Sequence, residues 1–529
     1  MNAKPTTTVR DAVLQLLRSF GTTTIFGNPG STELPLYRSF PNDFRYVLGL
    51  QEAAAVGMAD GYAAATRNAA FGNLHSAAGV GHAMGAIFTA YRNRTPLVIT
   101  AGQQARSILP TEPFLYSMQA TELPKPYVKW SVEPARAEDL PAAIARAYYV
   151  AMQPPRAPTF VSIPVDDWDH ATEPVQARQV SSAVRGAPDL LAQVGDALDS
   201  AKRPAFVVGA AVDRDGAWDL AVALAERHGA AVWESPNSGR CSFPESHPLF
   251  AGFLPAAKEA IVQRLDGYDV VLALGAPLFV YHREGFGPFL PADTHVFQLI
   301  DDPDVAAWLP TGTSVVTSLH LGLTDLLARP APPTRRPPPE ARGKPPRIKR
   351  RAAISVAYLM QTVHQTRPAR SIIVEEAPSS RRAMQAHVPI DRSGGFYTCN
   401  SGGLGYGIAA AVGVALAKPD DKVIALIGDG SSMYAIQALW TAGQLGLPVT
   451  FVIIRNRRYQ ALDEFGAHFG LAQTVGTKLP ALDFVALAKG HGLDGRDVER
   501  ADALEDGLRQ AFAAPSPNLV EVAVADDES

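Results

Sequence analysis

The chain has 529 residues, of which 47% are hydrophobic and 19% are charged, and its 52 acidic and 48 basic residues leave a formal net charge of -4. This length is too great for one hydrophobic core and favours about three domains, while the balanced charge speaks against a nucleic-acid partner. No apolar run approaches the roughly 18 residues of a membrane span. Arg10, Asp11 and Arg18 also interrupt the N-terminal segment where a secretory signal would be apolar.

The first 180 residues alternate between helical and buried extended patterns. Thr8 can cap a helix whose apolar residues within Val9 to Phe20 fall on one face, and the segment TTIFG after it predicts a short buried strand. Apolar runs at Leu97 to Thr100 and Thr159 to Pro164 predict further strands, and the Ala-rich stretch Glu52 to Thr66 predicts a helix. This alternation is typical of βαβ units with a parallel sheet covered on both faces.

A second α/β region follows and ends in a proline-rich linker. We expect a helix at Trp218 to His228 and strands at Ala205 to Gly209, Val270 to Gly275 and His295 to Ile300. The segment Ala328 to Arg347 holds eight prolines and several arginines. Such a composition predicts a stiff, extended and solvated linker.

Beyond the linker, the apolar pattern predicts a third α/β region with strands at Ser371 to Glu376, Lys422 to Gly428 and Val449 to Ile454. The fold class is therefore α/β, with three doubly wound parallel-sheet domains over residues 1–180, 181–340 and 341–529. Cys241 and Cys399 are too few for a disulfide framework and lack the spacing of a zinc site. A cytoplasmic protein without a membrane partner is expected.

The motif with the clearest chemistry lies in the third region. The segment VIALIGDGSSMYAIQALWTAGQLGLPVTFVIIRN reads as a buried strand, a Gly428-Asp429-Gly430 turn, a helix and a second buried strand that ends at Asn456. Asp429 and Asn456 would thus leave the carboxyl ends of parallel strands, the edge where open α/β sheets bind ligands. Their oxygens suit Mg²⁺ that keeps diphosphate oxygens in its shell, and the glycines let the backbone approach the phosphates. The following helix would offer free N–H groups.

A second glycine-rich segment, CNSGGLGYGIAA, allows another interpretation. Gly405, Gly407 and Ala410 fit a loose dinucleotide fingerprint, but SGG precedes them in place of a clean apolar strand. Nicotinamide binding is therefore disfavoured. A plain strand-turn-helix without a ligand is the corresponding alternative for the GDG segment, and the asparagine that follows in register speaks against it.

Several segments together resemble the thiamine diphosphate (ThDP) dependent 2-oxo acid decarboxylase family, and within it the benzoylformate decarboxylases. Besides the GDG segment these are FGNPGSTELPL, NLHSAAGVGHAMGA, TAGQQAR, LPKPYVKWS, VDDWD, GAPLFVYH and FYTCNSGGLGYG. The resemblance implies ThDP with Mg²⁺ or Ca²⁺ as cofactors and a small 2-oxo acid as substrate. It further implies decarboxylation of benzoylformate to benzaldehyde and CO₂, with carboligation as a side activity. The family uses a homodimer as its smallest working unit, and a homotetramer is favoured.

Carried over position by position, the resemblance implies the following residues. The metal ligands are Asp429, Asn456 and the backbone carbonyl of Arg458, and the catalytic residues are Glu52, Ser31, His75 and His282. The cofactor-binding residues are Glu52, Gly402, Leu404, Asp429, Gly430, Ser431, Tyr434, Asn456 and Tyr459. The substrate pocket is lined by Leu115, Leu462 and Phe465.

Each catalytic residue also has a structural interpretation. Glu52 could be an ordinary glutamate at a helix N-terminus, but thiamine chemistry needs a carboxylic acid beside the aminopyrimidine ring, and the apolar stretch after Glu52 would favour its protonated form. Ser31 could cap a helix, His75 could be a hydrogen-bonded core residue, and His282 could lie at the surface. Imidazoles titrate near neutral pH, however, and the product of CO₂ loss needs a proton.

Two positions depart from the family pattern. Arg455 stands where a first asparagine often precedes Asn456, and Pro378 replaces a hydroxyl residue expected near the cofactor. Two other functions remain open. One is an acetolactate-synthase-like carboligase or flavin-containing ThDP enzyme, although residues 180–330 show no dinucleotide fingerprint. The other is a non-catalytic protein of the ThDP fold.

Overall fold

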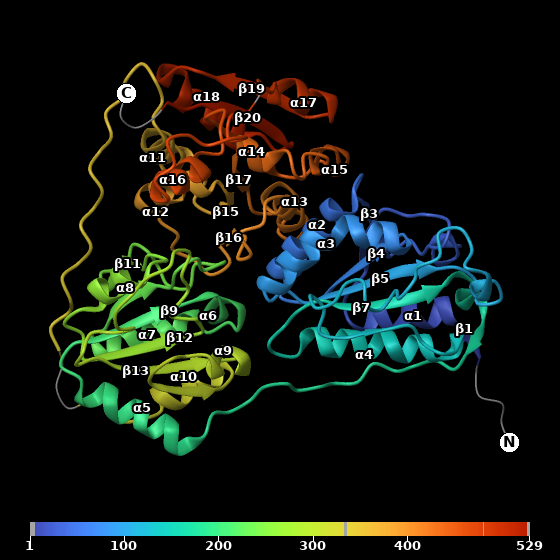
Figure 1. Cartoon of the computed structure of the whole chain (residues 1–529), viewed down its shortest axis with the longest axis horizontal. Coiled ribbons are helices and arrows are strands. Elements are labelled where there is room, and N and C mark those ends of the chain that lie inside the picture. The colour runs from blue at the N-terminus through green and yellow to red at the C-terminus, as the bar shows by residue number, and fades with distance from the viewer. Residues whose placement is uncertain (1–5, 333–335, 480, 526–529) are drawn as a thin grey trace. The chain divides into compact units, whose positions relative to one another are not determined.

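The computed structural model describes residues 6–332, 336–479 and 481–525. Its three six-stranded sheets confirm the predicted α/β class with three parallel-sheet domains (Figure 1). The chain divides into two compact units. The first comprises Met1–Val180, Arg350–Ser380 and Ser401–Ser529, and the second comprises Ser181–Lys349 and Arg381–Asn400.

The N-terminal sheet of the first unit is parallel, in the order β3-β2-β4-β5-β7-β6. Its strands are β2 (Thr24–Gly27), β3 (Arg45–Leu48), β4 (Ala70–Leu74), β5 (Leu97–Gln103), β6 (Ser131–Val132) and β7 (Thr159–Pro164). The helices around it are α1 (Val9–Ser19), α2 (Glu52–Thr66), α3 (Ser76–Arg92) and α4 (Leu140–Met152). Short 3-10 helices are η1 (Leu34–Tyr37), η2 (Leu109–Thr111), η3 (Ala137–Asp139) and η4 (Val165–Asp169), and β1 (Thr7–Thr8) pairs antiparallel with β8 (Ala171–Thr172).

Local sequence accounts for these elements. Thr8 caps α1 as predicted, because its hydroxyl accepts a hydrogen bond from the backbone N–H of Asp11 at 3.1 Å. Helix α2 has the predicted bounds, and its N-cap Gln51 accepts from the N–H of Ala54. One face of α1 and the central strands share a buried apolar core with α4.

Those strands of the C-terminal sheet that belong to the first unit run in the order β15-β17-β18-β20-β19 and are all parallel. Its strands are β15 (Ile372–Glu376), β17 (Val423–Gly428), β18 (Val449–Arg455), β19 (Asp494–Val498) and β20 (Asn518–Ala523). Its helices are α11 (Val356–Thr366), α13 (Gly407–Ala417), α14 (Asp429–Ser432), α15 (Ala438–Leu445), α16 (Gln460–His468), α17 (Phe484–Gly490) and α18 (Ala501–Ala513), with the 3-10 turn η5 (Pro378–Ser380).

The helix predicted after the GDG turn is present but interrupted. Helix α14 is a single turn, and α15 begins only at Ala438. The hydroxyl of Ser432 donates to the carbonyl oxygen of Asp429 at 2.7 Å, which competes with the backbone bond that a longer helix would make there. The second strand ends at Arg455, one residue beyond the predicted Val449 to Ile454 and directly before Asn456.

Within the first unit, helices α2 and α13 lie against each other at glycine positions. A Cβ atom at Gly61 would lie 2.2 Å from the carbonyl oxygen of Ala410, and one at Gly413 would lie 1.9 Å from that of Met58. Any residue other than glycine at these two positions would push the backbones of the two helices apart. Thr441 adds a hydrogen bond from its hydroxyl to the carbonyl of Leu48, at 2.7 Å.

The second unit holds the middle sheet, in the parallel order β11-β10-β9-β12-β13-β14 (green to yellow in Figure 1). Its strands are β9 (Pro204–Val208), β10 (Ala231–Glu234), β11 (Phe250–Phe253), β12 (Val270–Leu274), β13 (His295–Ile300) and β14 (Thr313–Val316). Its helices are α5 (Pro188–Ser200), α6 (Ala210–Arg214), α7 (Trp218–His228), α8 (Lys258–Leu265), α9 (Pro303–Ala307), α10 (Leu319–Leu327) and α12 (Arg381–His387), and β16 spans Phe396–Thr398. The strand order reverses between β9 and β12, which makes their carboxyl ends the switch point of this sheet.

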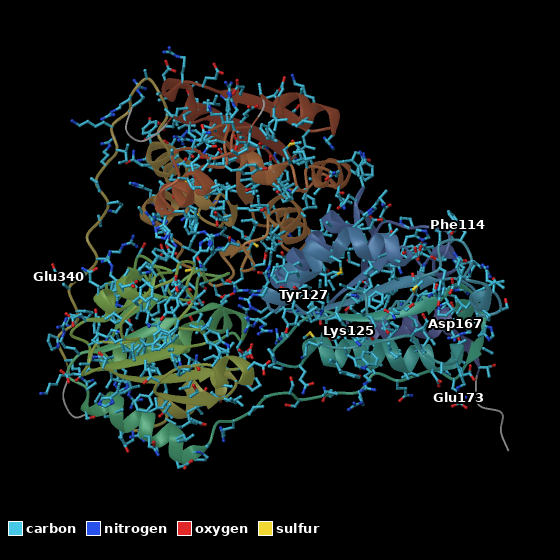
Figure 2. All side chains as sticks on the ribbon, viewed as in Figure 1. Phe114, Lys125, Tyr127, Asp167, Glu173 and Glu340 are labelled. Carbon is cyan, nitrogen blue, oxygen red and sulfur yellow. The ribbon has the colours of Figure 1, made fainter. Side chains whose placement is uncertain are left out.

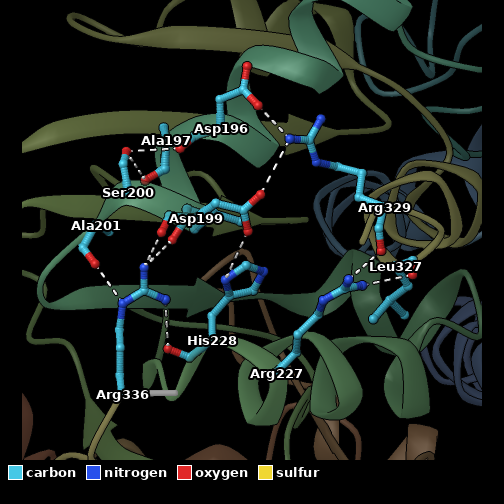
Figure 3. A network of polar contacts seen from close by, with 11 residues as sticks. Asp196, Ala197, Asp199, Ser200, Ala201, Arg227, His228, Leu327, Arg329 and Arg336 are labelled. Atoms are coloured by element: carbon cyan, nitrogen blue, oxygen red, sulfur yellow. Dashed lines mark hydrogen bonds and ion pairs between the residues drawn. The ribbon is translucent and has the colours of Figure 1, made fainter. Parts of the chain in front are cut away.

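The proline-rich linker differs in part from its prediction. Its described residues between α10 and α11 form neither helix nor strand, and most are exposed, but residues 333–335 lie outside the description. The guanidinium group of Arg336 donates to the carbonyl oxygens of Leu198, Asp199 and Ala201 at 2.6–2.8 Å (Figure 3). These carbonyls end helix α5, so the linker caps that helix and is not fully solvated.

Among the residues described, we find no helix that is both long enough and apolar enough to span a membrane.

Candidate active site

The carboxyl edge of the C-terminal sheet brings Asp429 and Asn456 together. Strands β17 and β18 are neighbours, and Asp429 and Asn456 follow them directly. The Asp429 carboxylate accepts hydrogen bonds from the N–H of Gly430 at 2.8 Å and of Arg457 at 2.6 Å. Asn456 accepts at its side-chain oxygen from the N–H of Arg458 at 3.2 Å. The GDG turn and the loop after Asn456 are therefore linked to each other by hydrogen bonds at this edge of the sheet.

Burial distinguishes Asp429 from an ordinary surface acid. The residue is 4% exposed, and this burial raises the pKa of its carboxyl group, although the backbone N–H groups of Arg457 and Gly430 oppose the shift. A buried carboxylate is costly unless a cation or donors balance its charge. The donor set fits a divalent cation, which prefers carboxylate, amide and carbonyl oxygens.

Aromatic side chains line the same edge. A Cβ atom at Gly430 would lie 2.3 Å from the ring of Tyr459, so only glycine leaves that space open. Tyr434, which is 56% exposed, lies beside Tyr459 and beside Gly405, whose Cβ would be 3.1 Å from that of Tyr434. Ser431, on the same turn as Gly430, is buried. The cofactor-binding residues predicted after β17 and β18 thus share one edge.

Arg455 does not reach this edge. Neighbouring residues of a strand point to opposite faces, so Arg455 and Asn456 diverge. The buried Arg455 guanidinium lies 2.6 Å from the Glu521 carboxylate and 3.3 Å from that of Asp497. The residue therefore ties β18 to β20 and β19, and its departure from the family pattern leaves the Asp429 side of the sheet unchanged.

The loop Ser401–Gly407 leads into α13 and carries Gly402 and Leu404. Gly402 has a φ of +73°, in the region that favours glycine, and Leu404 is half-buried. The Ser401 hydroxyl pairs with that of Thr89 at 2.9 Å. At the other end, the N–H of Gly405 donates to the Glu376 carboxylate at 2.6 Å. The loop is thus held at both ends.

Glu52 is the first residue of α2 and is 9% exposed. The predicted apolar surroundings are incomplete, because the Glu52 carboxylate lies 3.1 Å from Nδ1 of His82 on α3. This correction follows from the spacing of α3, which places His82 two turns after the helix start. A Cβ atom at Gly79 would be 3.4 Å from the Glu52 side chain, so the rest of its surroundings are closely packed.

His75 and the loop of Ser31 are neighbours at the carboxyl edge of the N-terminal sheet. A Cβ atom at Gly30 would lie 2.1 Å from Nδ1 of His75, whereas Ser31 itself is exposed. Glu33 is 1% exposed and lies 2.9 Å from the same Nδ1. Its carboxylate also accepts from the N–H of Gly30 and of Gly102, both at 2.9 Å.

These contacts determine what His75 can do. A carboxylate only accepts hydrogen bonds, so Nδ1 of His75 carries the proton shared with Glu33. Thr32 donates its hydroxyl to the other Glu33 oxygen at 2.7 Å. The other ring nitrogen, Nε2, takes no part in the contact with Glu33.

The structure does not place the remaining predicted residues at this site. His282 is exposed, donates its N–H to the carbonyl of Ala256 at 2.9 Å, and belongs to the second unit. Leu462, 53% exposed, and Phe465 lie on α16, whereas Leu115 lies on a loop of the N-terminal half with a φ of +65°. A pocket that joins the three stays a prediction, as does the role of His282.

Sequence reasoning missed Glu33, His82 and Glu376. Glu33 lies in the family-like segment FGNPGSTELPL and His82 in NLHSAAGVGHAMGA, so each is close in sequence to a predicted catalytic residue. A charged residue inside a segment matched to a catalytic site was the available signal. Glu376 ends an apolar strand, and a second acid beside Glu375 at a sheet edge was the signal there.

Known proteins match the whole chain. Models of the thiamine pyrophosphate enzyme N-terminal TPP binding domain, central domain and C-terminal TPP binding domain match residues 7–123, 191–326 and 378–522. Benzoylformate decarboxylase of Pseudomonas aeruginosa is 44% identical over 97% of this chain and 98% of that protein. Among solved structures, the 4-hydroxybenzoylformate decarboxylase of Rhodococcus jostii RHA1 has a TM-score of 0.95 and 41% identity over 99% of this chain and 100% of that chain. A thiamin diphosphate-dependent enzyme from Mycobacterium smegmatis has a TM-score of 0.94 and 42% identity, covering 98% of this chain and 100% of that chain.

The chain therefore belongs to the thiamine diphosphate enzyme family, and the predicted family resemblance is confirmed. ThDP with a divalent metal ion is its cofactor, as is usual in this family. Within the family it is a lyase, a 2-oxo acid decarboxylase similar to benzoylformate decarboxylase.

Proposed function

We propose that the chain catalyses the Mg²⁺-dependent, non-oxidative decarboxylation of an aromatic 2-oxo acid, with carboligation as a side activity. Benzoylformate takes up one proton and yields benzaldehyde and CO₂. The observation that carries the proposal is the position of Asp429 and Asn456 at adjoining strand ends, in a chain 44% identical to a benzoylformate decarboxylase. The Rhodococcus relative is a 4-hydroxybenzoylformate decarboxylase, which supports an aromatic acid as well.

The metal and diphosphate would be held at the C-terminal sheet. Asp429, Asn456 and the backbone carbonyl of Arg458 are the proposed Mg²⁺ ligands, and Ca²⁺ fits the same oxygens. Gly430 supports this assignment because its missing side chain leaves room beside Tyr459. The same edge carries the other proposed cofactor contacts, which are Gly402, Leu404, Ser431, Tyr434 and Tyr459.

ThDP, when bound, supplies the electron sink for the electron pair left by CO₂ loss. Glu52 would hold a proton at its carboxyl group for the aminopyrimidine ring, and its burial supports that role. His75 would move a proton at Nε2, because Glu33 occupies Nδ1. Ser31 would orient the substrate carboxylate, and His282 would exchange a further proton. Leu115, Leu462 and Phe465 would contact the aryl ring.

We further propose a homodimer as the minimum assembly, with a homotetramer favoured, in the cytoplasm. Large apolar side chains are exposed on two segments of the first unit: Phe114 is 87% exposed (Figure 2), Phe469 70% and Val475 91%. Clustered exposure of this kind is typical of protein interfaces. Two free, buried cysteines agree with a reducing compartment. Domain boundaries at 180/181 and 340/341 remain part of the proposal.

A flavin-containing or acetolactate-synthase-like enzyme is the less supported alternative. A flavin in the middle domain would need room at the switch point between β9 and β12. There the N–H of Gly209 donates to the carbonyl of Leu274 at 2.9 Å, and a Cβ at Gly209 would lie 2.6 Å from that of Ala276. The loops at this edge lie directly on each other. A non-catalytic protein is less supported because the first unit has a buried acid at the carboxyl edge of each of its two sheets. These acids are Glu33 at the N-terminal sheet and Asp429 at the C-terminal sheet.

Steady-state kinetics with benzoylformate, phenylpyruvate, pyruvate and a branched aliphatic 2-oxo acid test the proposal. Benzoylformate should have the highest kcat/KM, because an aryl group buries more apolar surface than a methyl group. At about 25 cal/mol per Å², each ~60 Å² of additional burial kept in the transition state contributes about 1.5 kcal/mol, or roughly tenfold. A higher kcat/KM for pyruvate would contradict the aromatic assignment while leaving the decarboxylase class intact. An absorbance scan of the purified protein would detect a bound flavin and so tests the alternative of a flavin-containing enzyme.

A further inference from the structure

Glu376 is a buried acid whose contacts are all directed at one functional loop. It is the last residue of β15 and is 3% exposed. One carboxylate oxygen accepts from the N–H of Gly405 at 2.6 Å, and the other accepts from the N–H of Gly407. The N–H of Tyr406 contributes as well. Three successive backbone donors at the start of α13 thus face one carboxyl group.

Such an arrangement is energetically demanding. Burial raises the pKa of Glu376 to about 8, against the opposing effect of the Gly407 and Gly405 N–H groups, and the neighbouring charge of Glu375 raises it further. A buried carboxyl group of this kind is destabilising unless every oxygen is satisfied. An ordinary N-cap side chain at the surface would satisfy the N–H groups at the start of α13 without burying a carboxyl group. The position of Glu376 therefore calls for an explanation beyond helix capping.

The loop that Glu376 holds supplies that explanation. Gly402 and Leu404 lie between two anchors, the Ser401–Thr89 hydroxyl pair and the Gly405–Glu376 bond. Gly405 has a φ of +106° and lies against Tyr434, so it has little room to relax. The N–H of Gly403 also donates to the Ser401 hydroxyl at 3.0 Å. Release of the Glu376 anchor would free the segment that carries Leu404.

We propose that Glu376 is a positioning residue of the reaction, which fixes Gly402 and Leu404 in the shape that receives the aminopyrimidine ring of ThDP. This inference rests on the proposed contacts of Gly402 and Leu404 with the cofactor. Glu376 acts through the loop and not by contact with the reacting atoms. Its strand neighbour Glu375 makes a different contact, since its carboxylate accepts from the N–H of Ala377 at 2.6 Å.

The test compares Glu376→Gln with the matched control Glu375→Gln, an equally buried acid on the same strand. A glutamine has one accepting oxygen, and its NH₂ group would face a backbone donor, so at least one of the contacts with the loop is lost. In calorimetry with Mg²⁺, the Kd of Glu376→Gln for ThDP should rise about tenfold or more, which corresponds to about 1.4 kcal/mol. Amide hydrogen exchange of residues 401–407 should accelerate, and kcat at saturating ThDP should fall with little change in KM. Glu375→Gln should retain wild-type values.

An unchanged Kd and unchanged exchange of residues 401–407 in Glu376→Gln would overturn the inference. Absence of ThDP binding by the wild-type protein would instead overturn the proposed cofactor site, so the two failures are distinguishable. If Glu376→Gln does not fold, Glu376→Asp keeps the carboxyl group but shortens the reach by one methylene. That variant should have an intermediate Kd, and a wild-type Kd would equally contradict the inference.

Discussion

At the carboxyl edge of the middle sheet the loops after β9 and β12 lie on each other, whereas at the same edge of the C-terminal sheet the loops after β17 and β18 present buried oxygens. In the middle sheet, the N–H groups of Gly209 and Ala211 donate to the carbonyls of Leu274 and Gly275 across the switch point, at 2.9 and 3.2 Å. Both edges follow the same α/β architecture. The fold alone therefore does not select the edge that binds ligand.

The acids at the two edges show the difference most clearly. Asp213, next to the middle sheet, is fully buried and bonded to Arg240 at 2.9 Å, to the Ser393 hydroxyl at 2.5 Å and to the Gly394 N–H at 2.9 Å. Asp429 is equally buried but is bonded to backbone N–H groups, and burial raises its pKa. A buried acid paired with an arginine already has its counter-charge, and removing either partner destabilises the fold. A buried acid bonded only to neutral N–H groups has no counter-charge, so it can still bind a cation.

The largest effect is expected for Asp429→Ala, which removes a proposed metal ligand. The Kd for ThDP in the presence of Mg²⁺ should rise by more than about a thousandfold, or about 4 kcal/mol. Asp213→Asn is the matched control at the other edge. It should lower the free energy of unfolding of the second unit by about 3 kcal/mol, because Arg240 loses its counter-charge, and leave the ThDP affinity unchanged. Calorimetry and urea titration measure the two quantities, and wild-type ThDP affinity in Asp429→Ala, or in EDTA, would refute the metal assignment.

Glu52→Gln should fold and bind ThDP but exchange the C2 proton of the cofactor about 100-fold more slowly, because an amide cannot hold the proton that the aminopyrimidine ring needs. Quenched-flow NMR measures this rate. His82→Asn, which changes the neighbour 3.1 Å from Glu52, should have a much smaller effect. Wild-type exchange in Glu52→Gln would return Glu52 to an ordinary helix N-terminal residue.

Glu33→Gln should lower kcat by about 10- to 100-fold with little change in KM, because the amide no longer fixes the proton on Nδ1 of His75. Thr32→Val removes a donor to Glu33 and the 3.1 Å contact of the Thr32 hydroxyl with Nδ1 of His75, but it keeps the His75–Glu33 contact and should change kcat less. Equal kcat values in all three proteins would show that the His75 network is structural.

The smallest effect concerns the pH dependence of the middle sheet. Burial raises the pKa of Glu234 well above its ordinary value. The unfolded carboxyl releases its proton near pH 4.5 while the folded one keeps it, so the unfolded state binds fewer protons and stability should fall as pH rises from there through the folded pKa. Urea titrations of the full chain from pH 4 to pH 9 test this decline. Glu234→Gln should flatten it, and a decline of equal slope in that variant would assign the effect to another group.

Sequence patterns predicted the elements well where local signals suffice. Helices Glu52–Thr66 and Trp218–His228 and strand His295–Ile300 have the predicted bounds. Residues that favour caps or turns lie next to such segments and end them. Gly229, which has a φ of +59°, ends α7 in this way. The exception was the GDG helix, where the Ser432 hydroxyl ends the first turn.

The site was predictable only in part, because its supporting contacts are long-range. Glu33 meets His75 across 42 residues, His82 meets Glu52 across 30, and Glu376 meets Gly405 across 29. No local pattern distinguishes such buried acids and imidazoles from solvated ones. Arg455 is the opposite case, since the two-residue period of a strand already predicts that it points away from Asn456.

Hydrogen exchange of the wild-type protein, with and without ThDP and Mg²⁺, tests the contrast between the two edges most directly. We predict that the cofactor slows exchange in residues 401–407, 428–434 and 455–460 of the C-terminal half and leaves residues 209–214 and 275–282 of the middle sheet unchanged. The loops of the middle sheet are already bonded to each other, so a ligand elsewhere adds nothing to their protection. Protection centred on residues 209–214 and 275–282, with none at 428–434, would contradict the assignment of the cofactor edge.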